Sequence, residues 1–184
     1  LMVFTAHKMY GPKGIGALYV HPDVGRLEPV LHGGGHERGL RSGTLNVPAI
    51  VGFGVAAAVA MAEVDQEAAR VAALRDQLLA GLLKTIPDLR INGSMAARLS
   101  HTLHVSTAGV DAKMLGSVLD DLAVSTGSAC SSGDAGPSYV LSALGLPDDL
   151  ARASIRFGLG RWTTSSTINH AIERVADRCG DGQG

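Results

Sequence analysis

Two apolar runs enclose a short polar turn at the start of the chain, and this arrangement limits the local fold more than any other feature. Residues 1–4 and 14–20 are runs of the kind that form buried strands, and Thr5, His7 and Lys8 lie between them. A lysine amine becomes nucleophilic near neutral pH when it is partly desolvated, and glycines let main chain approach a ligand closely. The pattern fits a lysine that holds a carbonyl cofactor as a Schiff base. The ordinary alternative is a solvated surface lysine.

The composition is that of a soluble globular protein of 184 residues. Sixteen basic and seventeen acidic residues, with no basic run, give no electrostatic reason to expect nucleic acid or an anionic membrane as a partner. Cys130 and Cys179 are too few for a disulfide framework and favour a reducing compartment. The longest apolar stretch, residues 50–62, is too short and too rich in Gly and Ala to span a bilayer, so we expect a cytoplasmic protein.

A glycine-rich loop over residues 31–44 is the second chemically informative segment. Three consecutive glycines exclude a stable helix, so His32 and His36 do not share a helical face and form only a weak metal pair. The string His-Gly-Gly-Gly also resembles the oxyanion loop of some esterases, but the pattern Gly-x-Ser-x-Gly occurs nowhere in the chain. Two interpretations stay open: a solvated loop whose arginines pair with nearby acids, or an anion site. The anion site would use backbone amides and the side chains of Arg38, Arg41, Ser42 and Thr44.

Helix and strand patterns alternate through the rest of the chain. Helices are predicted first over the small residues 49–61 and then over the amphipathic residues 71–84, which Pro87 ends. Further predicted elements, in order, are strands at 90–93 and 101–106, a helix at 111–119, a strand at 122–124, a helix from 137, a strand at 153–161 and a helix capped by Thr164.

Residues 125–137 are small or turn-forming and have almost nothing to bury. We therefore expect a mobile loop with the Cys130 thiol exposed near its middle. Such a thiol can be reactive, although many cysteines are inert small hydrophobic residues.

Arg156 projects from the polar face of the predicted strand 153–161, where its guanidinium could bind a carboxylate. The alternative is a surface ion pair, for instance with Asp148 or Asp149. His104 also falls on the polar face of its strand, and such a histidine is more often structural than catalytic.

Three separated strings closely resemble the pyridoxal-phosphate-dependent cysteine desulfurases of the class-V aminotransferase group. They are TAHKMYGPKGIGALYV, HGGGHERGLRSGTLNVPAIVGFG, and LAVSTGSACSSG followed by SIRFGLGRWTT. The small residues around Cys130 resemble those of the desulfurases that have a long mobile cysteine loop. Desulfurases of that type serve iron–sulfur cluster assembly. The resemblance implies an α/β fold, namely the C-terminal part of a fold-type I transferase. Residues 1–63 would end the large domain, and residues 64–184 would form a small α+β domain carrying the cysteine loop 125–137.

The resemblance also implies a cofactor site. Lys8 would hold pyridoxal 5'-phosphate covalently and, once displaced by the substrate amine, remove the Cα proton. Thr5 and His7 would bind the cofactor phosphate, and Thr44 would reach the phosphate in the other subunit of a homodimer. No metal site is implied.

The substrate implied by the resemblance is L-cysteine. Arg156 would bind its carboxylate, and the Cys130 thiolate would attack its sulfur, which leaves L-alanine and a persulfide on Cys130. The partner for this sulfur would be an acceptor or iron–sulfur scaffold protein.

The sequence also departs from the family pattern. Family members are longer, and they place before the lysine a Gly-Thr phosphate loop, a ring-stacking histidine and an aspartate that pairs with the ring nitrogen. None of these can be located here, so we expect a C-terminal portion that is nearly inactive alone, with strands 1–4 and 14–20 short of neighbours. Two other functions stay open: a non-catalytic sulfur carrier or assembly surface, and a class-V relative such as a selenocysteine lyase.

Overall fold

The computed structural model describes residues 1–107, 121–125 and 138–180. The chain divides into two compact units, Leu1–Asp65 and Gln66–Gly184. Helix α1 (Val47–Thr85) begins in the first unit and ends in the second. The assignment of residues 1–63 and 64–184 to a large and a small domain stays a prediction.

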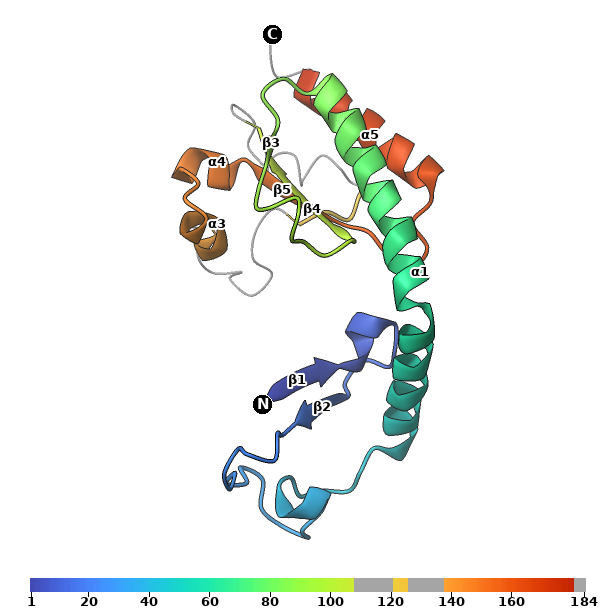
Figure 1. The fold of residues 1–184 in the computed structure, drawn as a ribbon, viewed down its shortest axis with the longest axis vertical. Coiled ribbons are helices and arrows are strands. Elements are labelled where there is room, and N and C mark those ends of the chain that lie inside the picture. Colours follow the sequence, from blue (N-terminus) through green and yellow to red (C-terminus); the bar gives the residue numbers. More distant parts are fainter. Residues whose placement is uncertain (108–120, 126–137, 181–184) are drawn as a thin grey trace. The chain divides into compact units, whose positions relative to one another are not determined.

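The first unit contains a two-stranded antiparallel ribbon (Figure 1). Strands β1 (Met2–Thr5) and β2 (Gly16–Tyr19) pair from Met2 opposite Tyr19 to Thr5 opposite Gly16. The prediction that residues 14–20 are buried on both faces is wrong, because all four residues of β2 are exposed. Each strand of the ribbon has the other as its only strand partner among the described residues.

Helix α1 is continuous over 39 residues, whereas the sequence predicted two separate helical segments. Residues 62–70 join the two segments without a break because they contain neither Gly nor Pro. Pro48 lies in the first turn of α1, where its missing N–H has no helical partner to lose. The buried residues of α1 recur at helical spacing in its C-terminal half: Val71, Arg75, Leu78, Leu79 and Leu82.

An 18-residue window of α1 has a mean hydropathy of 2.0 and is long and apolar enough to cross a membrane. None of this window is buried, and a single helix of this kind is weak evidence for a membrane protein. The result differs from the expectation that residues 50–62 are too short to span, since α1 extends the apolar segment at both ends.

The second unit contains an antiparallel sheet with the order β3-β4-β5 (Figure 1). Its strands are β3 (Arg90–Ile91), β4 (Thr102–Ser106) and β5 (Ser154–Gly158), which confirms the strands predicted near these positions. The register places His104 directly opposite Arg156. Because side chains alternate along a strand, these two side chains belong to the same face of the sheet.

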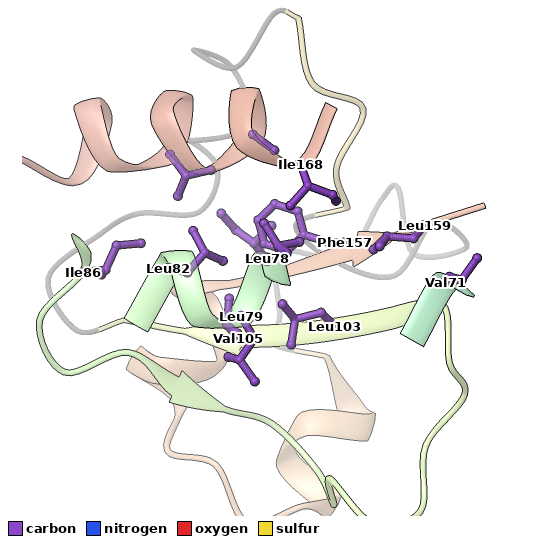
Figure 2. Close-up of a cluster of buried hydrophobic side chains, with 13 residues drawn as sticks. Val71, Leu78, Leu79, Leu82, Ile86, Leu103, Val105, Phe157, Leu159 and Ile168 are labelled. Atoms are coloured by element: carbon purple, nitrogen blue, oxygen red, sulfur yellow. The ribbon is translucent and has the colours of Figure 1, made fainter. Parts of the chain in front are cut away.

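The other face of this sheet forms the hydrophobic core of the second unit (Figure 2). The core joins the C-terminal half of α1, the strands β4 and β5, and helix α5 (Ser165–Gly180). The residues of β4 and β5 in the core alternate along each strand, as predicted: Leu103, Val105, Ile155 and Phe157. Thr164 caps α5 as predicted, because its Oγ1 accepts a hydrogen bond from the Thr167 amide at 3.2 Å.

The remaining elements of the second unit are short. Helix α3 (Tyr139–Ala143) confirms the helix predicted from residue 137, whereas helix α4 (Asp148–Arg152) was not predicted. The strand predicted at 122–124 is wrong, since these residues form no ladder; Ser125 instead makes an isolated bridge to β5. The helix predicted at 111–119 lies outside the described residues.

Candidate active site

The turn that carries Lys8 follows β1 directly and is a single 3-10 turn, Ala6–Met9. Main-chain hydrogen bonds fix it on both sides: the Ala6 amide donates to the Ile15 carbonyl at 3.2 Å, and the Gly11 amide donates to the Ala6 carbonyl at 2.9 Å. The Ala6 side chain is fully buried and anchors the turn, whereas His7 and Lys8 are exposed. The Lys8 side chain is exposed, whereas the Schiff-base interpretation requires an amine that is partly desolvated.

Thr5 and His7 lie together beside this lysine. The Thr5 Oγ1 and the His7 Nδ1 are 2.8 Å apart, which is hydrogen-bond distance. A hydroxyl and an imidazole held side by side next to an ammonium group form a compact set of donors for an anion such as a phosphate. The predicted residues Thr5, His7 and Lys8 are therefore brought together within four residues of chain.

Glycines allow the Lys8 turn to pack closely against the first half of α1. A Cβ atom on Gly11 would lie 2.9 Å from the Ala56 Cβ and 3.0 Å from the Ala6 carbonyl oxygen. A Cβ atom on Gly52 would lie 2.6 Å from the ring of Pro12. Side chains at either position would push the turn away from the helix, so the two glycines hold the lysine turn in place.

The glycine-rich loop is held together by its own hydrogen bonds. The Gly35 amide donates to the Ser42 Oγ at 3.2 Å, the Gly43 amide donates to the His36 Nδ1 at 3.3 Å, and the Arg41 guanidinium donates to the Gly43 carbonyl at 3.1 Å. These contacts shape the loop from within and leave the two interpretations, a solvated loop and an anion site, both open. Thr44 is exposed at the end of the loop.

A cavity of about 400 Å³ also lies in the first unit, lined in part by Val20, Arg26, Pro29 and Arg38. Its lining includes none of Thr5, His7 and Lys8. We place the candidate site at the lysine turn because the chemistry there depends on a nucleophile, which the cavity lining lacks.

Arg156 lies on the exposed side of β5 and is joined to Ser125 at three points. The Arg156 amide donates to the Ser125 carbonyl at 2.8 Å, the Ser125 amide donates to the Arg156 carbonyl at 3.1 Å, and the Arg156 Nη2 donates to the Ser125 Oγ at 3.4 Å. The alternative ion pairs with Asp148 or Asp149 are not among those found in the described residues. The guanidinium is thus anchored at one edge and can bind a carboxylate with the rest.

His104, opposite Arg156, has a perturbed ionisation. Burial is the main cause that lowers the pKa of His104 from 6.5 to about 4, and the positive charges of Arg156 and Arg98 lower it further. The imidazole is therefore neutral at physiological pH.

The structure leaves parts of the predicted site separate or undescribed. Cys130 and the predicted mobile loop 125–137 lie outside the described residues, apart from Ser125. Lys8 belongs to the first unit and Arg156 to the second. Sequence reasoning missed the contact of Ser125 with Arg156, because a serine at the start of a small-residue loop carries no signal for strand pairing.

The chain is similar in sequence to a known enzyme family. The sequence profile described as aminotransferase class-V matches residues 1–170. The chain is 55% identical over 177 residues to the protein named cysteine desulfurase IscS of Shewanella sp. (strain ANA-3), covering 95% of this chain and 43% of the relative. It is 53% identical over 180 residues to the protein of the same name of Anaeromyxobacter sp. (strain Fw109-5), covering 97% of this chain and 44% of the relative.

A solved structure titled NifS-like protein superimposes with a TM-score of 0.86 at 32% sequence identity, covering 97% of this chain and 46% of that one. The fold is therefore that of NifS-like enzymes, and the chain spans less than half the length of these relatives. Because the family profile covers most of the chain, this chain belongs to the class-V aminotransferase family.

Proposed function

We propose that the protein carrying this chain is a pyridoxal-phosphate-dependent cysteine desulfurase, which converts L-cysteine to L-alanine and retains the sulfur as a persulfide on Cys130. The observation that carries the proposal is the fixed turn with the Thr5 hydroxyl and the His7 imidazole 2.8 Å apart beside Lys8. The sequence identity of 55% to part of a protein named cysteine desulfurase supports the same activity.

The residues of the turn fit the cofactor. The Lys8 amine would bond to the aldehyde carbon, and Thr5 and His7 would donate hydrogen bonds to the phosphate. Thr44 would reach the phosphate of the partner subunit in a homodimer. Pyridoxal phosphate, when bound, supplies an electron sink for the electrons of the substrate Cα–H bond.

The protein side chains then divide the remaining work. The Arg156 guanidinium would bind the substrate carboxylate and so fix the orientation of the Cα–H bond. The Lys8 Nζ, once free, would take the Cα proton as a general base. The Cys130 thiolate would attack the substrate sulfur, so an S–S bond forms, the C–S bond breaks, and its electron pair returns to carbon, which is protonated to give alanine.

The persulfide sulfur would pass to a thiol of an acceptor protein, such as an iron–sulfur scaffold, in the cytoplasm. This transfer regenerates the Cys130 thiolate, so no external oxidant or reductant is required.

The test uses the intact natural protein with added pyridoxal phosphate. We expect a visible absorption band of the bound cofactor and alanine release from L-cysteine, both lost in Lys8→Ala. Cys130→Ser should keep the band and lose persulfide formation. A protein that accepts sulfur without any band would instead be a sulfur carrier, and one that releases alanine only from selenocysteine would be a selenocysteine lyase.

A further inference from the structure

His104, Arg156 and Ser125 form a row across three neighbouring segments of the second unit. His104 on β4 is directly opposite Arg156 on β5, and Ser125 pairs with Arg156 from the other side. Directly opposite residues of antiparallel strands have Cβ atoms about 4.5–5.5 Å apart. The imidazole of His104 and the guanidinium of Arg156 therefore begin from adjacent points on one face of the sheet.

Along the strands, this face of the sheet is buried on one side of the row and open on the other. Towards one end, Ser106 and Ser154 are buried, and the Ser154 hydroxyl donates to the Ala151 carbonyl of α4 at 2.7 Å. Towards the other end, a Cβ atom on Gly158, two residues beyond Arg156 on β5, would meet no atom within 4 Å. Among the described residues, a small ligand can thus lie beside the exposed Arg156, on the face to which His104 also belongs.

The His104 ring has donor capacity that the protein itself does not use. No hydrogen bond joins the imidazole to any residue that the structure describes, although the side chain is partly buried. A neutral imidazole carries one N–H donor, and in His104 this donor is open to water or to a ligand. The charged groups that shift the pKa of His104 are both cationic, Arg156 and Arg98, so we expect a ligand that accepts from this ring to be an anion.

We propose that His104 is a second carboxylate-binding residue, whose ring N–H donates to the same substrate carboxylate that the Arg156 guanidinium binds. The inference rests on the proposed function, because it takes the L-cysteine carboxylate as the anion at Arg156. A neutral donor beside one cation holds a carboxylate in a fixed direction without bringing two positive charges together. Ser125, bonded to Arg156, holds the guanidinium from the opposite side.

The test compares two ligands that differ by the carboxylate alone, L-cysteine and cysteamine. The intact protein loaded with pyridoxal phosphate carries Cys130→Ala to prevent turnover, and binding is followed through the cofactor absorbance. We expect His104→Ala to weaken L-cysteine binding about tenfold, the size of one hydrogen bond to a charged group, and to change cysteamine binding less than about twofold. Equal losses for both ligands, or no loss for either, would overturn the inference.

Two further variants control for structural effects. His104→Asn keeps a neutral donor and should recover most of the L-cysteine affinity lost in His104→Ala. His101→Ala alters an exposed histidine just before β4 and should leave both affinities unchanged. If His104→Asn binds L-cysteine as weakly as His104→Ala, hydrogen bonding by His104 is not the cause.

A measurement without any substitution at His104 covers the case in which the variants fail to fold. The pKa of His104, followed by NMR, should rise when the protein is saturated with L-alanine, because a carboxylate stabilises the imidazolium. An unchanged pKa with L-alanine bound overturns the inference. Loss of carboxylate selectivity in Arg156→Ala is the separate test of the proposed function: if Arg156→Ala has no effect, the proposed carboxylate site itself is wrong.

Discussion

The ribbon of the first unit and the sheet of the second are built from similar apolar strands but differ in cover. Ala6 is the single buried residue of residues 1–65, all of which the structure describes, and Val3 on β1 is 79% exposed. In the second unit, Leu103 on β4 is 0% exposed beneath α1 and α5. An isolated two-stranded ribbon is marginally stable in water, whereas a sheet with a packed hydrophobic face is stable alone.

The difference bears on the candidate site. The Arg156–His104 row rests on a sheet with its own core, so its geometry is set within the second unit. The Lys8 turn is fixed by local hydrogen bonds and by the glycine contacts with α1, but its strands lack a covered face. The two halves of the proposed chemistry therefore depend on different sources of stability.

The largest expected effect on stability comes from a substitution in the hydrophobic core of the second unit. Leu82→Ala removes a fully buried side chain between α1 and the sheet, and we expect a loss of about 2–5 kcal/mol in the free energy of unfolding. Val3→Ala, the matched truncation on the exposed ribbon, should change it by less than about 0.5 kcal/mol. Urea unfolding followed by circular dichroism measures both. Equal losses would mean that the ribbon of the first unit is buried as well as the sheet of the second.

A smaller effect tests how the segment after β5 is held. The Arg70 guanidinium on α1 donates to the carbonyls of Gly160, Arg161 and Thr163, at 3.2, 2.9 and 2.9 Å. Arg70→Ala leaves these carbonyls to water, so we expect a loss of about 1–2 kcal/mol. Arg70→Lys serves as the control, because an ammonium group cannot reach the carbonyls with the geometry of a planar fork. If Arg70→Lys is as stable as the natural protein, the fork is not the stabilising feature.

Local patterns were sufficient for much of this fold. The alternation of apolar and polar residues predicted β4 and β5 with the correct faces, and the Thr164 cap of α5 was identified from residue type. The lysine turn followed from a strand that ends in polar residues and glycines, and Thr5 and His7 are in contact beside Lys8. Features that a few consecutive residues determine were therefore accessible.

Features that depend on pairing between distant residues were not accessible. The burial of β2 was predicted from its composition, but burial depends on the neighbours that a strand has, and β2 pairs with β1 alone among the described residues. The sequence favours a structural role for His104, because the pattern of one strand cannot reveal that the register puts it opposite Arg156. The single helix α1 was divided in two because its exposed and buried halves carry different residue patterns.

The stability of the second unit should depend on pH through His104 on β4. The folded-state pKa of His104 is lowered to about 4 mainly by burial, so between pH 6.5 and about 4 the unfolded chain binds a proton that the folded chain does not. Stability should fall as the pH falls through this window. After allowance for partial solvent screening, we expect a loss of about 1–2 kcal/mol. The free energy of unfolding of His104→Gln should be nearly constant over this range. If it still falls with pH as in the natural protein, other groups cause the dependence.

The smallest expected effect concerns the exposed carboxylate that ties residue 121 to α5. The His170 Nε2 lies 2.7 Å from the Asp121 Oδ2, and the Arg174 Nε lies 3.1 Å from both carboxylate oxygens. The hydrogen bond from His170 is the main cause that lowers the pKa of Asp121 below its ordinary value of 3.8, and Arg174 lowers it further.

Because the folded-state pKa of Asp121 is depressed, its contribution to stability is present above pH 3.8 and is lost as the pH falls through the lowered value. NMR titration of the Asp121 carboxyl group should give this lowered pKa, and added salt should bring it back towards 3.8, because the group is at the surface. His170→Gln and Arg174→Gln should each raise the pKa, because each removes a donor that stabilises the carboxylate. If His170→Gln left the pKa unchanged, the guanidinium of Arg174 rather than the imidazole would be the main partner of Asp121.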